Sequence, residues 1–276
     1  MRLRFKTNDY LLAWNLLFGA SFSQSVHEFK HKLYKTHKTQ YATIQKDAKE
    51  MLRDLKNFIP DNDTLYNRVF DTELFMNLKN DTEKHRLELL KIWDKNKANI
   101  NKELRNILKF SMQDDYNIIV LHPIMDTVIT EKNCMNIGWG FKRDLRNPEL
   151  TLTKIVYNIV KNEFGTIDKK YKDIVDVVLE LAIQNELYYR LSGKSTFQEG
   201  DSSLTYLKRQ IYPYFLMYLG AEKEDFTSYM MRDNITFDIE KYQVIEKLKD
   251  MNLLDFIEFC IEYQWKIVRI NQLEII

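Results

Sequence analysis

The sequence contains few of the residues that end helices. Its 276 residues include 7 glycines and 4 prolines. Because these two residues supply most tight turns and helix breaks, their scarcity favours long helices joined by few turns. A hydrophobic content of 45% is sufficient for a sizeable core. The composition therefore predicts a helix-rich globular protein.

The sequence also has few cysteines and almost no net charge. The two cysteines, Cys134 and Cys260, are far apart and form no CxxC pair, which argues against a disulfide framework and favours a reducing cytoplasm. The 41 basic and 40 acidic residues leave a net charge of +1, so no overall field recruits nucleic acid or an anionic membrane. The uncharged run at residues 10–26 is too short and too polar to span a bilayer. We therefore expect a cytoplasmic protein without membrane contact.

Helical periodicity dominates both ends of the chain. The sequence "TND" at residues 7–9 is typical of a helix start, and an apolar helix is expected from there to residue 19. Apolar residues recur at helical spacing over residues 23–55, and again after "NDTE" at residues 80–83, which predicts two long helices. Further helices are expected over residues 151–164, 169–191 and 203–219.

Residues 111–140 have β character instead. The stretches "YNIIVLHP", "DTVIT" and "NCMNIGWG" are short, β-branched and bounded by turn residues, which predicts two or three antiparallel strands. We therefore expect a mainly α fold with a small antiparallel β-sheet in the middle of the chain. Residues 1–110 would form a helical subdomain that includes the two long helices, and residues 111–276 a helix-rich body around the sheet. One continuous domain is the alternative.

The stretch "HEFKH" at residues 27–31 matches the pattern H-E-x-x-H. Histidines four residues apart lie on one helix face, so His27 and His31 could share a zinc ion while Glu28 activates a bound water. His37 falls ten residues after His27, and the string therefore resembles the signature of the metzincin zinc peptidases. That resemblance implies a zinc-dependent hydrolase.

Two features of the same stretch oppose zinc binding. Tyr34 stands where the metzincin signature has the glycine that ends the helix. If the helix continues to Leu55, His37 points roughly 80–120° away from the other two histidines. Lysines lie between and just after the histidines, and their charge opposes a divalent cation. The sequence therefore favours a solvated helix face, with zinc on His27 and His31 as the alternative.

Residues 116–191 place a strand before two helices, "LTKIVYNIVKNEF" and "YKDIVDVVLELAIQNEL". This order resembles the gluzincin zinc peptidases, in which a later helix supplies a glutamate ligand. Tyr157 and Lys161 then stand at the histidine places, Asn158 at the general-base place and Glu180 at the third-ligand place. The resemblance implies a zincin-like pseudoenzyme without its zinc ligands, in which a Lys161–Glu180 contact replaces the ion. Alternatively, Glu180 belongs to the polar stripe of an ordinary core helix.

The stretch "YLKRQIYPYFLMYL" at residues 206–219 interleaves basic and aromatic side chains. Such a pattern can stack bases and grip phosphates, and it also lines the inside of helix pairs. If these side chains meet Glu180 across a cleft, they form the best pocket in the chain. The pocket candidates are Lys208, Arg209, Tyr212, Tyr214 and Tyr218.

These patterns favour a non-catalytic or catalytically degenerate protein with a binding role, no cofactor, and a peptide or protein as its partner. The first alternative is a zinc hydrolase that uses His27 and His31 as ligands and Glu28 as base. The second is an acidic partner or nucleic acid bound through the lysine-rich helix face at Lys30–Lys38. Acidic residues in the flanking segment compensate that charge, so binding of nucleic acid is not expected.

Overall fold

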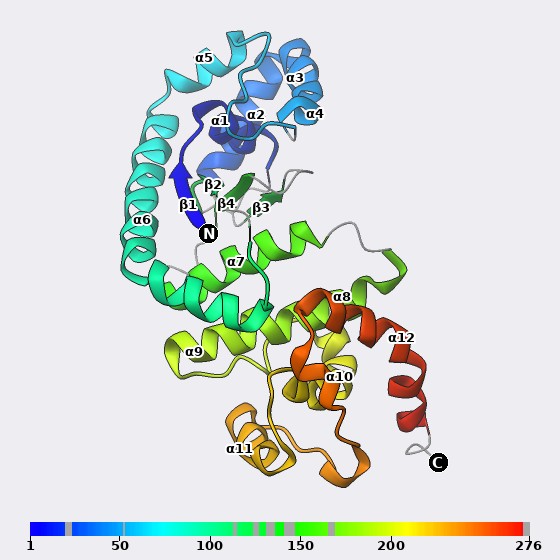
Figure 1. The fold of residues 1–276 in the computed structure, drawn as a ribbon. Helices are drawn as coiled ribbons and strands as arrows, with labels where there is room; N and C mark the ends of the chain where they lie inside the picture. Colours follow the sequence, from blue (N-terminus) through cyan, green and yellow to red (C-terminus); the bar gives the residue numbers. More distant parts are fainter. Residues whose placement is uncertain are drawn as a thin grey trace. The chain divides into compact units, whose positions relative to one another are not determined.

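The computed structural model describes residues 1–19, 24–51, 53–112, 115–123, 127–130, 136–140, 147–164 and 169–272. The fold is mainly helical, as predicted, and the chain forms two compact units (Figure 1). Unit 1 comprises Met1–Lys97 and Gln113–Thr151, and unit 2 comprises Ala98–Met112 and Leu152–Ile276. The domain division expected near residue 110 stays a prediction.

Unit 1 combines a small sheet with short helices and most of one long helix. Its elements are β1 (Arg2–Lys6), α1 (Asp9–Phe18), α2 (Gln24–Thr36), α3 (Lys38–Ile44), η1 (Gln45–Asp47), α4 (Ala48–Met51), α5 (Thr64–Phe70), the first part of α6 (Glu73–Leu108), β2 (Asp115–Val120), β3 (Thr127–Thr130), β4 (Asn136–Gly140) and the start of α7 (Pro148–Glu163).

The sheet has the strand order β1-β2-β4-β3, and the prediction of an antiparallel sheet is wrong. Strands β1 and β2 pair in parallel, as do β2 and β4, and β3 pairs antiparallel with β4. All the helices from α1 to α6 lie between β1 and β2 in the chain, and such a long crossover is what a parallel pair requires. Three strands do fall within residues 111–140, as predicted. However, β4 lies between β2 and β3 in the sheet, so strands that follow one another in the chain are not all paired with one another.

Strand β1 was missing from the sequence prediction. Its residues alternate in burial, with Leu3 and Phe5 buried opposite Tyr116 and Ile118 of β2. The alternating residues Arg2 and Arg4 are exposed, and both bind Asp115, at 2.7 and 2.9 Å. The alternation of charged and apolar residues in "RLRFK" is the period-two signal of a half-buried strand.

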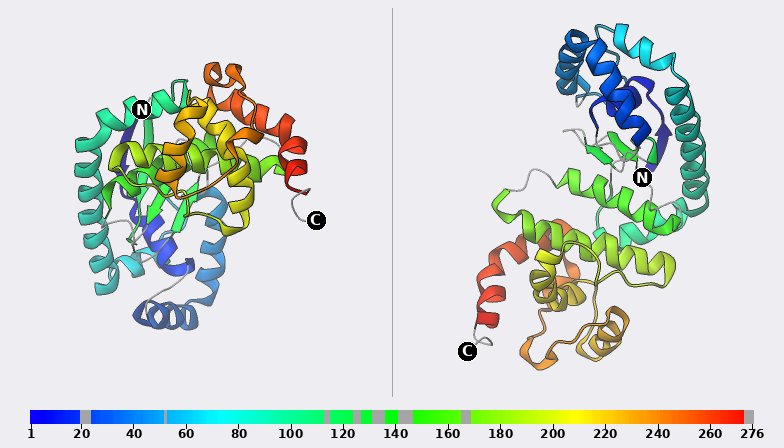
Figure 2. Two further views of the ribbon diagram at one scale, coloured as in Figure 1. Left: turned by 90° about the horizontal axis from the view of Figure 1, so that it is seen from below. Right: turned by 180° about the vertical axis from the view of Figure 1, so that it is seen from behind.

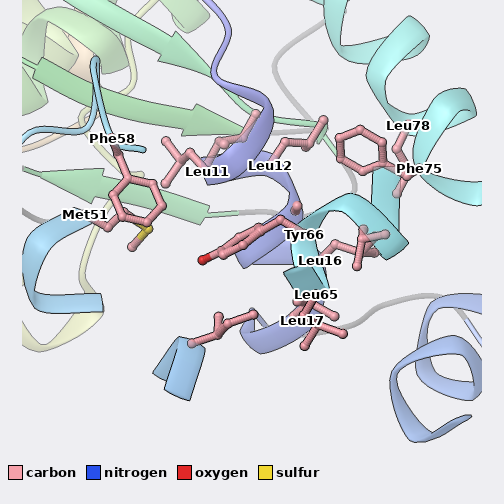
Figure 3. Packing of buried hydrophobic residues seen from close by; sticks show 14 of the residues in the cluster. Leu11, Leu12, Leu16, Leu17, Met51, Phe58, Leu65, Tyr66, Phe75 and Leu78 are labelled. Atoms are coloured by element: carbon pink, nitrogen blue, oxygen red, sulfur yellow. The ribbon is translucent and has the colours of Figure 1, made fainter. Parts of the chain in front are cut away.

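Helix α1 begins where "TND" predicted. The side chain of Asn8 accepts hydrogen bonds from the backbone N–H groups of Tyr10 and Leu11, which satisfies two amides of the first turn. The helix is buried on most sides, and its leucines pack with side chains of α4, α5 and α6 in one apolar cluster (Figure 3). Tyr66 of α5 lies in this cluster and donates a hydrogen bond to Asp47 at 3.1 Å.

The long helix expected over residues 23–55 is also wrong. The chain leaves helical geometry at His37, with φ −135° and ψ 39°, and α2 ends there. The hydroxyl of Thr36 donates to the backbone carbonyls of Lys32 and Leu33, and such back-bonding bends or ends a helix. The apolar stripe resumes after the break at Tyr41 and Ile44, so periodicity alone did not reveal it. The other long helix, α6, exists and runs through "NDTE" without a break.

The regular elements in the described residues of unit 2 are all helical. It contains the end of α6, most of α7, η4 (Lys169–Tyr171), α8 (Lys172–Leu179), η5 (Glu180–Leu187), α9 (Tyr188–Ser192), η6 (Ser202–Leu204), α10 (Thr205–Tyr218), α11 (Lys223–Asp233), η7 (Ile239–Lys241), η8 (Glu246–Asp250) and α12 (Leu253–Gln272). Helix α8 packs against α10 and α12 (Figure 2). No helix among the described residues has the length and apolarity that a bilayer crossing needs.

Candidate functional site

The helical segment η5 carries buried polar residues into the interior of unit 2. It is a π-helix that continues α8 and leads into α9, and seven of its eight residues are buried. Glu180, Asn185 and Glu186 are among the buried ones. π-helical turns are rare and often occur at functional sites, which makes η5 the first place to examine. The sequence predicted an ordinary helix here, and its periodicity gave no sign of the wider turn.

Glu180 forms an ion pair with Lys208 of α10. The carboxylate and the ammonium are 3.3 Å apart, and the side chains are 8% and 5% exposed, respectively. The same ammonium donates to the backbone carbonyl of Glu199 at 3.0 Å. Burial lowers the pKa of Lys208, and the Glu180 carboxylate offsets part of that shift. The pair is therefore almost completely removed from solvent.

The backbone at Gly200 closes the space over the Glu180 carboxylate. Gly200 has φ +110°, a conformation that residues with a side chain rarely adopt. A Cβ atom at this position would lie 2.6 Å from Oε2 of Glu180. Glycine is thus required both by the turn and by the approach of the loop to the ion pair.

A second ionic cluster surrounds Glu186, six residues further along η5. Its carboxylate accepts hydrogen bonds from Arg190 and from Arg232 of α11, both at 2.8 Å. Arg190 also binds Glu103 at 3.1 Å, and Arg232 also binds Asp233 at 2.8 Å. These alternating charges join α6, η5, α9 and α11, so the cluster cross-links unit 2.

Asp233 extends this cluster to α10. It accepts hydrogen bonds from the hydroxyl of Tyr212 and from the side-chain amide of Asn185, the latter at 3.2 Å. Burial and the Asp233 carboxylate raise the pKa of Tyr212 above its ordinary value. Asn185 in turn accepts from the Ser195 hydroxyl and the Thr196 backbone N–H, each at 3.0 Å. Each of these polar groups therefore has a partner inside the protein.

The two charged residues that the gluzincin resemblance selects, Lys161 and Glu180, form their ion pairs with other residues. Lys161 binds Asp176 at 2.6 Å, so the positive charge that faces Glu180 comes from α10 and not from α7. Tyr157 lies beside the Lys161–Asp176 pair, with the Lys161 ammonium 5.6 Å from the centre of the tyrosine ring. The side chain of Asn158 donates to the carbonyl of its own helix one turn back, at 2.9 Å.

The donor groups at these places do not fit a zinc ion. An ammonium already bound to a carboxylate and an amide bound to backbone are not the neutral imidazoles or thiolates that zinc prefers. Burial raises the pKa of Tyr157, with further contributions from Asp176 and Glu180, so its hydroxyl is held protonated. Glu180 is committed to Lys208.

The "HEFKH" residues lie in unit 1 on the solvent side of α2. His27, Glu28 and His31 are exposed, and Glu28 accepts a hydrogen bond from Gln24 at 2.8 Å. His37 lies at the break after α2, with its Nδ1 atom 2.6 Å from the Thr36 hydroxyl. In the described part of the chain, no three or more His, Cys, Asp or Glu residues are grouped so that they could hold a metal. Zinc on His27 and His31 stays a prediction.

Some lysines of the Lys30–Lys38 face contact other groups of the protein and are less available to a partner than the sequence suggests. The Lys30 ammonium donates to the backbone carbonyl of Gly19 and is partly buried, which lowers its pKa. Lys38 lies over the ring of Tyr34, 6.0 Å from the centroid. Lys32 and Lys35 are exposed. The proposed use of this face for an acidic partner stays a prediction.

The pocket candidates on α10 point in different directions. Lys208, Tyr212 and Tyr218 are buried, and the hydroxyl of Tyr218 donates to the backbone carbonyl of Ile107. Tyr214 packs edge-on against Tyr242, with the ring centres 5.6 Å apart. Arg209 is exposed. Of the five candidates, Arg209 lines the pocket described next.

An open pocket of about 470 Å³ lies beside α10 and α11. Among the described residues that line it, Arg209 is the single charged one, and the others are Thr227, Met230, Met231, Asn234, Ile235 and Thr236. Among the described residues, none forms an ion pair or side-chain hydrogen bond with the Arg209 guanidinium. Met231 is 79% exposed. Sequence reasoning identified Arg209 but missed the methionines, whose signal is the apolar pair in the otherwise polar "SYMMRDN".

Comparison with models of protein families, with curated proteins and with solved structures gives no match to this chain. The functional interpretation therefore depends on the geometry of the chain's own residues.

Proposed function

We propose that the protein is a non-catalytic binding protein that holds a peptide segment of a partner protein in the pocket at Arg209. One contrast carries this proposal. The charges buried around η5 are paired with one another, whereas the Arg209 guanidinium, at an open pocket, has no protein partner among the described residues.

The buried groups are poorly suited to catalysis. A general base needs a free lone pair within reach of substrate, and a nucleophile needs an activated form. Glu180 and Glu186 receive hydrogen bonds from neighbouring cations, and the Tyr212 hydroxyl donates to Asp233. These contacts support a structural role for the cluster.

The pocket suits a peptide better than an enclosed small molecule. Small-molecule sites cover about 70–90% of their ligand, which an open pocket with a projecting methionine cannot do. Methionine side chains are flexible and polarizable, and they recur at surfaces that adapt to protein segments. The cytoplasm is the proposed location, because two cysteines without a paired motif suit a reducing compartment.

The test is selection of binders from a random peptide library, followed by titration of the selected peptides. Wild type, Arg209→Glu and the control Arg68→Glu are compared, because Arg68 is an exposed arginine of α5 in unit 1. We expect Arg209→Glu to lose binding, Arg68→Glu to keep it, and mass spectrometry to recover the peptides intact.

Two results would overturn the proposal. The first is binding that Arg209→Glu leaves unchanged. The second is cleavage of the peptides by wild type; its loss in Glu28→Gln would then favour the zinc hydrolase.

A further inference from the structure

We infer that the pocket at Arg209 recognises a carboxylate flanked by apolar side chains, as in a peptide with an aspartate or glutamate between large aliphatic residues. This inference rests on the proposed function and adds the chemical class of the ligand. Three properties of the lining residues carry it: the charge, the placement of the apolar side chains and the free hydrogen-bonding groups.

The charge of the lining calls for an anion. Arg209 is one cation among the seven lining residues that the structure describes, and none of the other six carries a charge. A guanidinium offers a planar fork of donors that matches a carboxylate with two parallel hydrogen bonds. The acidic residue next to the pocket, Asp233, is buried and already bound to Arg232 and Tyr212. It does not neutralise Arg209.

The single positive charge of the pocket favours a carboxylate over a phosphate as the ligand. A phosphorylated side chain carries close to two negative charges, and the domains that read it use clusters of arginines. This pocket provides a single guanidinium. One carboxylate balances that charge.

The apolar side chains that line the pocket differ in exposure. Ile235 is buried, Met230 is half-buried and Met231 is the most exposed large hydrophobic side chain among the described residues. These three side chains offer apolar surface to an apolar side chain of a ligand. Burial of such a side chain removes apolar surface from water and therefore favours binding.

Three polar side chains complete the lining. Thr227, Asn234 and Thr236 are exposed and, within the described ranges, make no side-chain hydrogen bond. Their hydroxyl and amide groups can both donate and accept, which suits the alternating N–H and C=O groups of a peptide backbone.

The test uses three libraries of short synthetic peptides that differ at one central position. The central residue is glutamate, glutamine or phosphoserine, and leucine or methionine flanks it on both sides. Binding is measured by fluorescence anisotropy with wild type, Arg209→Glu and Met231→Gln. The matched controls are Arg68→Glu and Met76→Gln, which change an exposed arginine and an exposed methionine of unit 1.

We expect the glutamate library to bind wild type at least about tenfold more tightly than the glutamine library, the usual value of a charge-assisted hydrogen bond. Arg209→Glu should abolish that preference, Met231→Gln should weaken both libraries, and the two controls should match wild type. Circular dichroism verifies that every variant is folded.

The possible failures are distinguishable. If the glutamine library binds equally well and Met231→Gln weakens it, the carboxylate preference is wrong while the binding role remains. If phosphoserine is preferred, the ligand is a phosphopeptide and the inference is overturned. If neither Arg209→Glu nor Met231→Gln changes any binding, or no library binds, both the inference and the proposed function fail.

Discussion

Helix α2 and the π-helix η5 both carry charged residues that suggested a site, but they use them in opposite ways. On α2, His27, Glu28 and His31 match a catalytic pattern and lie in solvent. On η5, Glu180 and Glu186 match no complete motif and are buried against cations. A motif states which side chains are close in sequence. Burial decides whether their charges must be paired, and therefore whether they hold the fold together.

Two ion pairs of the protein show the same contrast between exposed and buried charges. Asp81 and Lys84 of α6 are 3.0 Å apart with side chains 56% and 73% exposed, whereas Glu180 and Lys208 are nearly fully buried. Surface pairs typically contribute about 0–1 kcal/mol, because water and salt screen them. Breaking a buried pair leaves an uncompensated charge in the interior, which is far more costly.

The largest expected effect is therefore that of Lys208→Met. It should lower the free energy of unfolding by about 3–5 kcal/mol, since Glu180 is left buried without its cation. The matched change Lys84→Met removes an exposed lysine and should cost less than about 1 kcal/mol. Urea unfolding followed by circular dichroism measures both.

The double variant Glu180→Leu/Lys208→Met is the control for that prediction. Replacing both partners by apolar groups removes the unpaired charge, so the double variant should recover most of the lost stability. Equal costs for Lys208→Met and Lys84→Met would show that the buried pair is no more important than the surface pair.

The pH dependence of unit 1 should follow His85, a buried histidine of α6. Both of its ring nitrogens lack a hydrogen-bond partner in the described structure, and burial, with His122 nearby, lowers its pKa to about 4. Between the ordinary value near 6.5 and about 4, the unfolded chain binds a proton that the folded chain does not. The free energy of unfolding should therefore fall by up to about 3 kcal/mol as the pH drops through this window.

The variant His85→Leu isolates this contribution from that of the carboxylates. Its stability should fall less between pH 7 and pH 4 than that of wild type, while the exposed control His31→Gln should follow wild type. Denaturant unfolding at a series of pH values gives the comparison. Identical pH profiles for wild type and His85→Leu would contradict the prediction.

A smaller effect is expected at Gly200. In Gly200→Ala the new Cβ meets the Glu180 carboxylate, and the backbone must hold an unfavourable positive φ, which should cost about 1–3 kcal/mol. The control Gly193→Ala also has positive φ, +71°, but finds nothing within 4 Å. The melting temperature of Gly200→Ala should therefore be lower than that of Gly193→Ala. The reverse order would show that the backbone at Gly200 does not lie in close contact with Glu180.

The smallest effect separates two tyrosines of α10. Tyr212→Phe removes the hydrogen bond to Asp233 and should cost about 1–2 kcal/mol. Tyr214→Phe removes a hydroxyl that has no hydrogen bond in the described residues, so a change below about 0.5 kcal/mol is expected. Chemical unfolding of the two variants measures the difference. Equal costs would show that the hydrogen bond from Tyr212 to Asp233 does not stabilise the fold.

Local signals in the sequence predicted much of the secondary structure. The cap at Asn8, the strands within residues 111–140 and the helices of unit 2 each depend on neighbouring residues. The parallel pairing of β1 and β2 depends on residues more than a hundred positions apart, so local periodicity could not reveal it. The break at His37 was hidden because the apolar stripe resumes after it.

The candidate site was predictable only in part. Lys208 and Glu180 were both selected from the sequence, but their burial, which decides their role, depends on how α8 and α10 pack. Arg209 was selected with them because it is adjacent to Lys208 in sequence, yet its side chain is exposed. The methionines that share its pocket come from α11 and carry no motif.

The central claim is that the buried ion pair maintains the fold while the pocket at Arg209 binds the ligand. The most direct test is titration of the glutamate-centred peptide library with the folded double variant Glu180→Leu/Lys208→Met and with Arg209→Glu. We predict that the double variant binds like wild type and that Arg209→Glu binds at least about tenfold more weakly. Loss of binding in the folded double variant, with Arg209→Glu unaffected, would contradict the claim and move the site to Glu180 and Lys208.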